Sequence, residues 1–199
     1  MIHCRVQVVQ AFFGALLSLV AATALAAPEL HAPLPSLEIE ERGELFMQGD
    51  DFEYRPWSTQ RNPGTVHVLQ FFNGTMGDSK IFEPFTDRLQ EVYAVTELHV
   101  STIINLDAAL WGTTGFVVSE VKKNKKKYPH STLVLDAEGT ASRDWALGEQ
   151  GSVLVMVDPK GVVQYMTREA MSDEEIQAGI ELVGQYVVAA AAGTAPAGK

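Results

Sequence analysis

The chain has 199 residues, of which 46% are hydrophobic and 20% charged, so it is long enough for one globular domain with a full core. Its formal net charge is −10, and this excess of negative charge opposes binding to nucleic acids and to anionic lipids. The composition excludes collagen-like repeats, and we expect no nucleic-acid partner.

The first 26 residues have the features of a secretory leader. Arg5 supplies a positive charge, and the apolar stretch over residues 11–27 ends in small residues. Residues 24–26 form an A-x-A site, and cleavage there avoids a mature chain that begins with Pro28. We therefore expect residues 1–26 to be a cleaved signal peptide, which predicts a periplasmic protein with no stable membrane insertion after processing.

An uncleaved membrane anchor is the alternative for this segment. Residues 6–27 are uncharged and 22 residues long, which is enough to span a bilayer. The alanine-rich end is more typical of a peptidase site than of a membrane helix. Cys4 is the only cysteine and lies inside the leader, so residues 27–199 contain no thiol.

Extended structure is predicted for the next part of the chain. Residues 27–40 are rich in proline and indicate an extended lead-in. Short apolar segments on both sides of Gly49 predict a β-hairpin over residues 45–54. Residues 66–72 form a nearly continuous apolar run, which is typical of a central strand buried on both faces.

A helix is predicted after this strand. Asp78 or Ser79 is the expected N-cap, and apolar residues recur at helical spacing as far as Val92. Pro84 lies inside the predicted helix and should kink it.

A second strand and a second helix follow. Residues 98–104 predict the strand, and the helix is predicted over residues 116–128, with Pro129 after it. This helix is expected to bury Phe116, Val117 and Val121.

Three strands and a last helix complete the prediction. Two strand–turn units cover residues 132–139 and 153–161, and residues 162–165 continue the second as a hairpin. Ser172 and Glu175 form a capping box for the last helix. Its predicted buried stripe consists of Ile176, Ile180, Val183 and Val187.

The predicted order is a hairpin followed by β-α-β-α-β-β-β-α. Strands that alternate with helices and close with a hairpin indicate an α/β fold, with a mixed sheet and helices on both faces. This domain is assigned to residues 41–188, and residues 189–199 form a low-complexity tail.

The end of the central strand and the start of the next helix resemble the active-site segment of thioredoxins. In that family, aromatic residues end the strand, Cys-x-x-Cys-Lys opens the helix, and a proline follows. Met76 and Ser79 stand at the two cysteine positions of this chain. Lys80 and Pro84 match the family pattern, and Asp78 replaces the usual proline.

Further matches make this resemblance more specific. Residues 152–161 are similar to the P-T-x-x-x-I-D-x-x-G segment of the superfamily, with Ser152 in place of its cis-proline. An ordered series of segments within residues 40–185 resembles the YtfJ-like periplasmic proteins of Gram-negative bacteria. These segments are 103–107, 116–129, 135–139 and 145–147. The resemblance implies a thioredoxin-like fold, a periplasmic location and an uncharacterised function.

Thiol chemistry is excluded for residues 27–199 by their lack of cysteine. Disulfide exchange needs a thiolate to attack and a second sulfur to resolve the intermediate. The thioether of Met76 has no proton to lose, and the Ser79 hydroxyl is a poor nucleophile without a neighbouring base. We expect no thiol-dependent oxidoreductase activity and no cofactor.

The degenerate active-site positions form the candidate ligand site. They are Asn73, Gly74, Met76, Asp78, Ser79, Lys80 and Ser152. Backbone N–H groups at a helix start, together with Lys80, favour an anionic group, whereas Asp78 opposes one. A loop with only a structural role is the alternative. The first hypothesis is a non-catalytic binding or accessory protein for a periplasmic protein or a small ligand.

Two other hypotheses use the same loop. One is a cysteine-independent enzyme in which Asp78, Ser79 and Lys80 act near Asn105 and Asp107. The other is periplasmic metal handling, in which the Met76 thioether and a histidine would bind Cu(I).

The histidines give this metal hypothesis little support. His31, His67, His99 and His130 lack the spacing of known metal-binding motifs, so we assign no metal site.

Residues 122–127 form a basic run in this acidic protein. Most of its lysines are expected on the solvated face of a helix, with cations near the helix C-terminus. Docking to an acidic partner or to anionic headgroups is the alternative interpretation.

Overall fold

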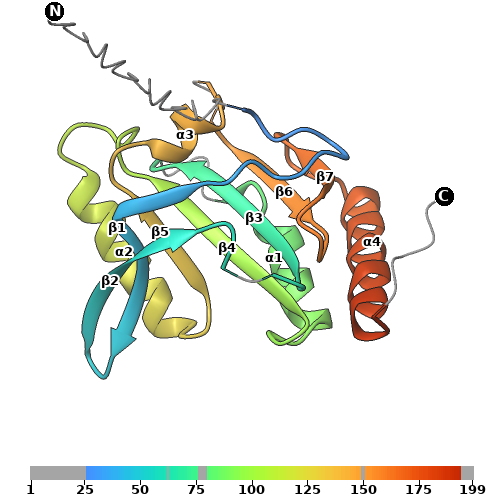
Figure 1. Cartoon of the computed structure of the whole chain (residues 1–199). Helices are drawn as coiled ribbons and strands as arrows, with labels where there is room; N and C mark the ends of the chain where they lie inside the picture. The colour runs from blue at the N-terminus through green and yellow to red at the C-terminus, as the bar shows by residue number, and fades with distance from the viewer. Residues whose placement is uncertain (1–25, 62, 76–79, 149–150, 194–199) are drawn as a thin grey trace, which may run out of the picture.

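A computed structural model describes residues 26–61, 63–75, 80–148 and 151–193 (Figure 1). Within these residues, seven strands form one mixed sheet in the order β2-β1-β5-β4-β3-β6-β7. The strands are β1 Glu38–Gln48, β2 Asp51–Ser58, β3 Val66–Asn73, β4 Leu98–Asn105, β5 Thr132–Asp136, β6 Val153–Val157 and β7 Val163–Thr167. The helices are α1 Glu83–Val92, α2 Thr114–Lys127, α3 Thr140–Asp144 and α4 Asp173–Ala191.

The sheet confirms the predicted mixed α/β fold with an N-terminal hairpin. Strands β3, β4 and β5 run parallel to one another, and β6 and β7 continue the sheet in antiparallel pairing. The β1–β2 hairpin adds to the other edge through antiparallel pairing of β1 with β5.

Strand β3 lies at the centre of the core. Every residue from Val66 to Phe72 is buried, as its apolar sequence predicts. Alternate side chains contribute to two hydrophobic clusters on opposite faces of the sheet, with Leu69 and Phe71 in one and Val68 and Phe72 in the other.

Helices α1, α2 and α4 cover one face of the sheet. The crossovers β3-α1-β4 and β4-α2-β5 advance in the same direction along the sheet, so right-handed connections place α1 and α2 on the same face. Side chains of α4 pack with those of α1 over β3. The opposite face is covered by α3 and part of the N-terminal lead-in (Figure 1).

The predicted kink at Pro84 is wrong. Helix α1 begins at Glu83, so Pro84 lies in its first turn, where no intrahelical bond needs the N–H group that proline lacks. The N-cap position belongs to Phe82, whereas the predicted caps Asp78 and Ser79 lie outside the described residues.

The predicted burial of α2 is only partly correct. Val121 is buried, Val117 is half-buried, and Phe116 is 52% exposed. Val121 packs against β-strand side chains of the sheet, whereas Phe116 lies in the first turn of the helix.

Helix α3 is absent from the predicted order of elements. Its five residues are too few to show a helical period. The buried Asp136 carboxylate fixes its start by accepting hydrogen bonds from the backbone N–H groups of Thr140 and Ala141, at 2.9 and 2.8 Å.

The capping box of the last helix is confirmed. Ser172 Oγ accepts a hydrogen bond from the Glu175 N–H, and the Glu175 carboxylate accepts one from the Ser172 N–H. Ile180, Val183 and Val187 of the predicted stripe are buried, and the helix extends to Ala191. Across the described ranges, the structure contains no helix with the length and apolar character needed to cross a membrane.

Strand β1 carries an irregularity that depends on glycine. The pairing register with β2 shifts between Ile39 and Glu44, and Gly43 has a φ of +69° within this irregular segment. A Cβ atom at Gly43 would lie 2.2 Å from the backbone oxygen of Arg55. The strand can therefore pass its partner only if residue 43 has no side chain.

We expect Gly43→Ala to lower the free energy of unfolding by at least about 3 kcal/mol, because the left-handed conformation and a backbone clash add together. Gly49→Ala is the matched control. Gly49 also has a positive φ, but nothing lies within 4 Å of a Cβ there, so about 1 kcal/mol should be lost. Urea unfolding monitored by circular dichroism measures both. Equal losses would contradict a steric role for Gly43.

Candidate functional site

The carboxyl ends of β3 and β4 meet at one edge of the sheet. The two strands are parallel and in register, so Asn73 lies opposite Asn105. The Gly74 N–H donates a hydrogen bond of 2.8 Å to the Asn105 carbonyl oxygen. A Cβ atom at Gly74 would lie 2.8 Å from that oxygen, so glycine permits this close approach.

The side chains of the two asparagines hold this edge together. Asn105 Nδ2 donates to Asn73 Oδ1 at 3.3 Å. Asn105 Oδ1 accepts hydrogen bonds from the backbone N–H groups of Asp107 and Ala108, at 3.0 and 3.4 Å. The Asn105 amide therefore stabilises the turn after β4.

Residues before β6 reach the same edge. A Cβ atom at Gly151 would lie 2.5 Å from Asn73 Nδ2, so the Asn73 side chain packs directly against Gly151. Ser152 is buried, and its Oγ has no hydrogen-bond partner within the part of the chain that the structure describes. Asn73, Gly74 and Ser152 of the candidate site thus lie at one edge.

The remaining candidate residues differ in what the structure shows. Met76, Asp78 and Ser79 lie outside the described residues. Lys80 is exposed and lines a cavity beside the edge.

This cavity, which we name the loop-side cavity, has a volume of about 440 Å³ and lies between the start of α1 and helix α2. Its apolar lining consists of Phe72, Ile104, Phe116, Val117, Val121 and Leu133. Its polar lining includes Asn73, Thr75, Lys80, Glu83, Glu120 and Asn124. An apolar cavity with a few polar groups is typical of a site that binds a small or extended ligand.

The hypothesis of a cysteine-independent enzyme depends on convergent side chains. Asp78 and Ser79 lie outside the described residues, and the Asn105 amide is used by the turn after β4. Among the residues that the structure describes, no hydrogen bond joins Lys80 to Asn105 or Asp107. Within the described part of the edge, Asn105 supports the turn after β4.

Two histidines come together at the opposite end of the same strands. His67 and His99 are register partners, with ring centroids 4.9 Å apart in an edge-on arrangement. His67 Nε2 lies 2.9 Å from Ser101 Oγ, and His99 Nε2 lies 3.2 Å from Thr132 Oγ1. Burial, assisted by the neighbouring His99, lowers the pKa of His67 to about 3. Burial also lowers the pKa of His99, with Arg61 adding to the effect.

This geometry separates the histidine pair from the degenerate loop. Asn73 follows His67 by six residue steps of extended strand, which corresponds to about 20 Å. The described residues contain no group of three or more side chains that could hold a metal ion. Met76, the other partner of the metal hypothesis, lies outside them.

Most lysines of the basic run lie on the solvated face of α2, as expected, but one is buried. Lys123, Lys126 and Lys127 are exposed, but Lys125 is 5% exposed and its Nζ donates to the Ser131 carbonyl oxygen at 2.5 Å. Burial lowers the pKa of Lys125, whereas the buried Glu44 opposes this shift.

The aromatic side chains of the hairpin explain why lysines gather on this side of α2. Lys122 and Lys126 lie over the ring of Phe52, with Nζ 5.2 and 5.6 Å from its centroid. Lys125 lies in the same way over Phe46. These contacts join α2 to the β1–β2 hairpin through lysine stems and cation–π attraction.

Acidification should destabilise the protein through His67. Because its folded pKa is lowered, the unfolded chain binds the proton first, so stability is full above pH 6.5 and falls as the pH drops towards 3. We expect a slope of about 1.4 kcal/mol per pH unit from this group.

The control for this prediction is His67→Gln, which removes the titrating ring. Urea unfolding between pH 7 and pH 4 should show a smaller pH dependence for the variant than for the wild type. Parallel curves for the two proteins would show that His67 is not the group responsible.

The fold and its edge define a thioredoxin-like protein without cysteine at the degenerate active-site positions. The structure is similar to a protein from Bacteroides thetaiotaomicron described as a protein disulfide isomerase, with a TM-score of 0.57, 15% identity and coverage of 81% of this chain and 91% of that one. It is also similar to the thioredoxin domain of a thiol-disulfide oxidoreductase from Bacteroides vulgatus, with a TM-score of 0.54, 10% identity and coverage of 78% and 98%. At these identities the similarity shows the fold alone.

The family follows from closer relatives. The model of the YtfJ_HI0045 family, bacterial proteins of unknown function, matches residues 29–186, and this chain belongs to that family. An uncharacterised protein of Haemophilus influenzae is 31% identical over 156 residues, 78% of this chain and 85% of the relative. The uncharacterised protein YtfJ of Escherichia coli is 32% identical over 151 residues, 75% of this chain and 82% of the relative. The resemblance inferred from the sequence is confirmed.

Proposed function

We propose that this protein is exported, processed after Ala26 and acts in the periplasm as a non-catalytic binding or accessory protein. The leader features of residues 1–26 support export. The absence of cysteine from residues 27–199 removes the thiol chemistry for which the fold is otherwise suited.

The loop-side cavity is the observation that carries the binding function. It lies beside the edge where Met76 and Ser79 stand at the cysteine positions of the thioredoxin pattern, and much of its lining is apolar. The polar side chains of that edge, Asn73 and Asn105, form hydrogen bonds within the fold. A site with an apolar surface and a supporting polar frame favours binding over proton or group transfer.

The same lining suggests the type of ligand. Phe72 and Ile104 offer an apolar surface, Lys80 offers a positive charge, and Glu83 and Glu120 offer negative charges. An amphipathic small ligand or an extended segment of a periplasmic protein would match this mixture. The whole ligand would contact both the apolar lining and the charged groups.

Export predicts one defined N-terminus. We expect the protein from the periplasmic fraction to begin at Ala27, as measured by intact mass spectrometry. Ala26→Tyr places a bulky residue at the cleavage position and should cause the unprocessed chain to accumulate. A wild-type chain found intact in the membrane fraction would instead support the uncleaved anchor.

Binding at the loop-side cavity predicts position-dependent crosslinking in cells. A photo-crosslinking amino acid at Phe116 should capture a ligand or partner, because this exposed residue lines the cavity. Lys123 is the matched control, since it is exposed on the same helix but does not line the cavity. Capture from Lys123 alone would move the site to the basic run and contradict the proposal.

A further inference from the structure

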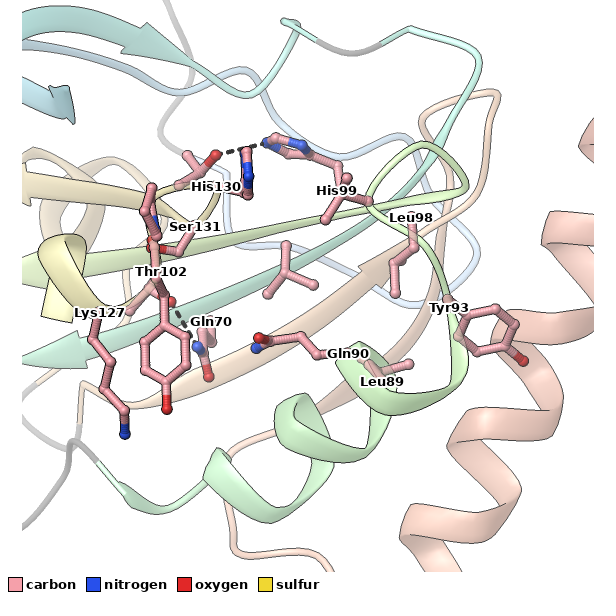
Figure 2. A pocket seen from close by; sticks show the side chains of 15 residues that line it. Gln70, Leu89, Gln90, Tyr93, Leu98, His99, Thr102, Lys127, His130 and Ser131 are labelled. Atoms are coloured by element: carbon pink, nitrogen blue, oxygen red, sulfur yellow. Dashed lines mark hydrogen bonds between the residues drawn. The ribbon is translucent and has the colours of Figure 1, made fainter. Parts of the chain in front are cut away.

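A second cavity, which we name the Gln70 cavity, lies on the helix-covered face of the sheet towards the amino end of β4. Its volume is about 560 Å³. Figure 2 shows its walls, which come from α1 on one side and from the segment around Tyr128 to Ser131 on the other. It shares Thr102 with the loop-side cavity, but no residue of the degenerate loop lines it and neither does Ser152, so the inference below uses different residues from the proposed function.

Gln70 places an unsatisfied polar group at the bottom of this cavity. It interrupts the apolar sequence of β3 and is 8% exposed. Its Nε2 donates a hydrogen bond of 2.6 Å to Thr102 Oγ1, its register partner on β4. Its Oε1 is buried and has no hydrogen-bond partner within the described residues.

The stability of the fold does not by itself explain a glutamine at this position. A buried acceptor without a partner lowers stability, and a leucine at position 70 would remove that penalty. The other side chains of β3 on this face, including Val68 and Phe72, are apolar. The Oε1 atom of Gln70 would therefore accept a hydrogen bond from a donor group of a ligand.

The walls add groups of the same chemical character. In Figure 2 the carboxamide of Gln90, on α1, points towards that of Gln70, and both lie within the cavity. Tyr128, which is 47% exposed, lines the opposite wall, and Lys127 Nζ lies over its ring. Hydroxyl groups of Thr102, Ser131 and Thr132 complete the uncharged polar lining.

The charges around the cavity argue against an ionic ligand. None of the described residues that line it is an aspartate or a glutamate, so a cation has no counter-charge there. Lys127 is the lysine of the lining, and its Nζ lies 4.7 Å from the centroid of the Tyr128 ring. Tyr128 is the main cause of the raised pKa of Lys127, and Asp87 and Glu83 on α1 add smaller contributions. Lys127 is exposed to solvent, which screens its attraction for an anion.

We propose that the Gln70 cavity binds a neutral polyhydroxylated small molecule, of the size of a mono- or disaccharide. A ligand hydroxyl would donate to Gln70 Oε1, and the second amide, on Gln90, offers both a donor and an acceptor to neighbouring hydroxyls. The face of the Tyr128 ring opposite Lys127 would offer a flat apolar surface to the C–H face of a sugar ring. The cavity volume lies within the range of sites for molecules of this size.

The test uses the protein as isolated from cells and a panel of glucose, N-acetylglucosamine, trehalose and sorbitol. Glycylglycine and citrate represent the amide and anionic classes. We expect at least one panel sugar at millimolar concentration to shift the NMR signal of the Gln70 side-chain amide and to raise the melting temperature. No response to any sugar, or a response to glycylglycine or citrate alone, overturns the proposal.

Three variants separate binding from folding. Gln70→Leu should weaken sugar binding by about tenfold or more and raise the urea midpoint, because it removes an unsatisfied group. Tyr128→Ala changes an exposed wall residue, so it should weaken binding without changing the urea midpoint. Gln185→Leu, on the exposed surface of α4, is the control and should change neither.

Two results with these variants would overturn the proposal of sugar binding. Unchanged affinity in Gln70→Leu overturns the proposal. So does a lowered urea midpoint in Gln70→Leu together with unchanged affinity in Tyr128→Ala, which would assign Gln70 a structural role. Crosslinking from Phe116 depends on the loop-side cavity, so its result and the sugar result are distinguishable.

Discussion

The in-register parallel pairing of β3 with β4 is the constraint on which the other features depend. Both strands are largely apolar, yet each of the three polar residues of β3 falls opposite a polar residue of β4. These pairs are His67 with His99, Gln70 with Thr102, and Asn73 with Asn105. A shift of one residue would break all three pairs and turn the apolar side chains to the wrong face, so register and core are specified together.

The helix arrangement gives each pair a different environment. Because α1 and α2 cover the same face of the sheet, a gap between them lies above Gln70 and Thr102. Thr102 lines both the loop-side cavity and the Gln70 cavity, so the gap is hollowed towards both ends of the strands. In the histidine pair, burial lowers the pKa of both rings, and His99 also lines the Gln70 cavity.

The β2 strand of the N-terminal hairpin is an edge of the sheet, so its free backbone groups could pair with another chain. Charged Arg55 and Pro56 lie on this strand, and both features oppose pairing with another chain. The buried Glu44 forms an ion pair with Arg61 and lies near Lys125, so the basic run of α2 contributes to the packing of the hairpin. The positive charge of residues 122–127 therefore gives no direct evidence of an acidic partner.

The sequence by itself determined the strands, the capping box of Ser172 and Glu175 and the thioredoxin-like order of elements, because these depend on local periodicity and residue type. It also determined that residues 27–199 contain no cysteine. It could not determine that Pro84 opens its helix, that Lys125 is buried or that Gln70 lies beneath a gap between two helices. Those features depend on which distant segments pack together. Tertiary packing assigns a solvent environment to each polar residue, and that environment decides whether it supports the fold or remains available to a ligand.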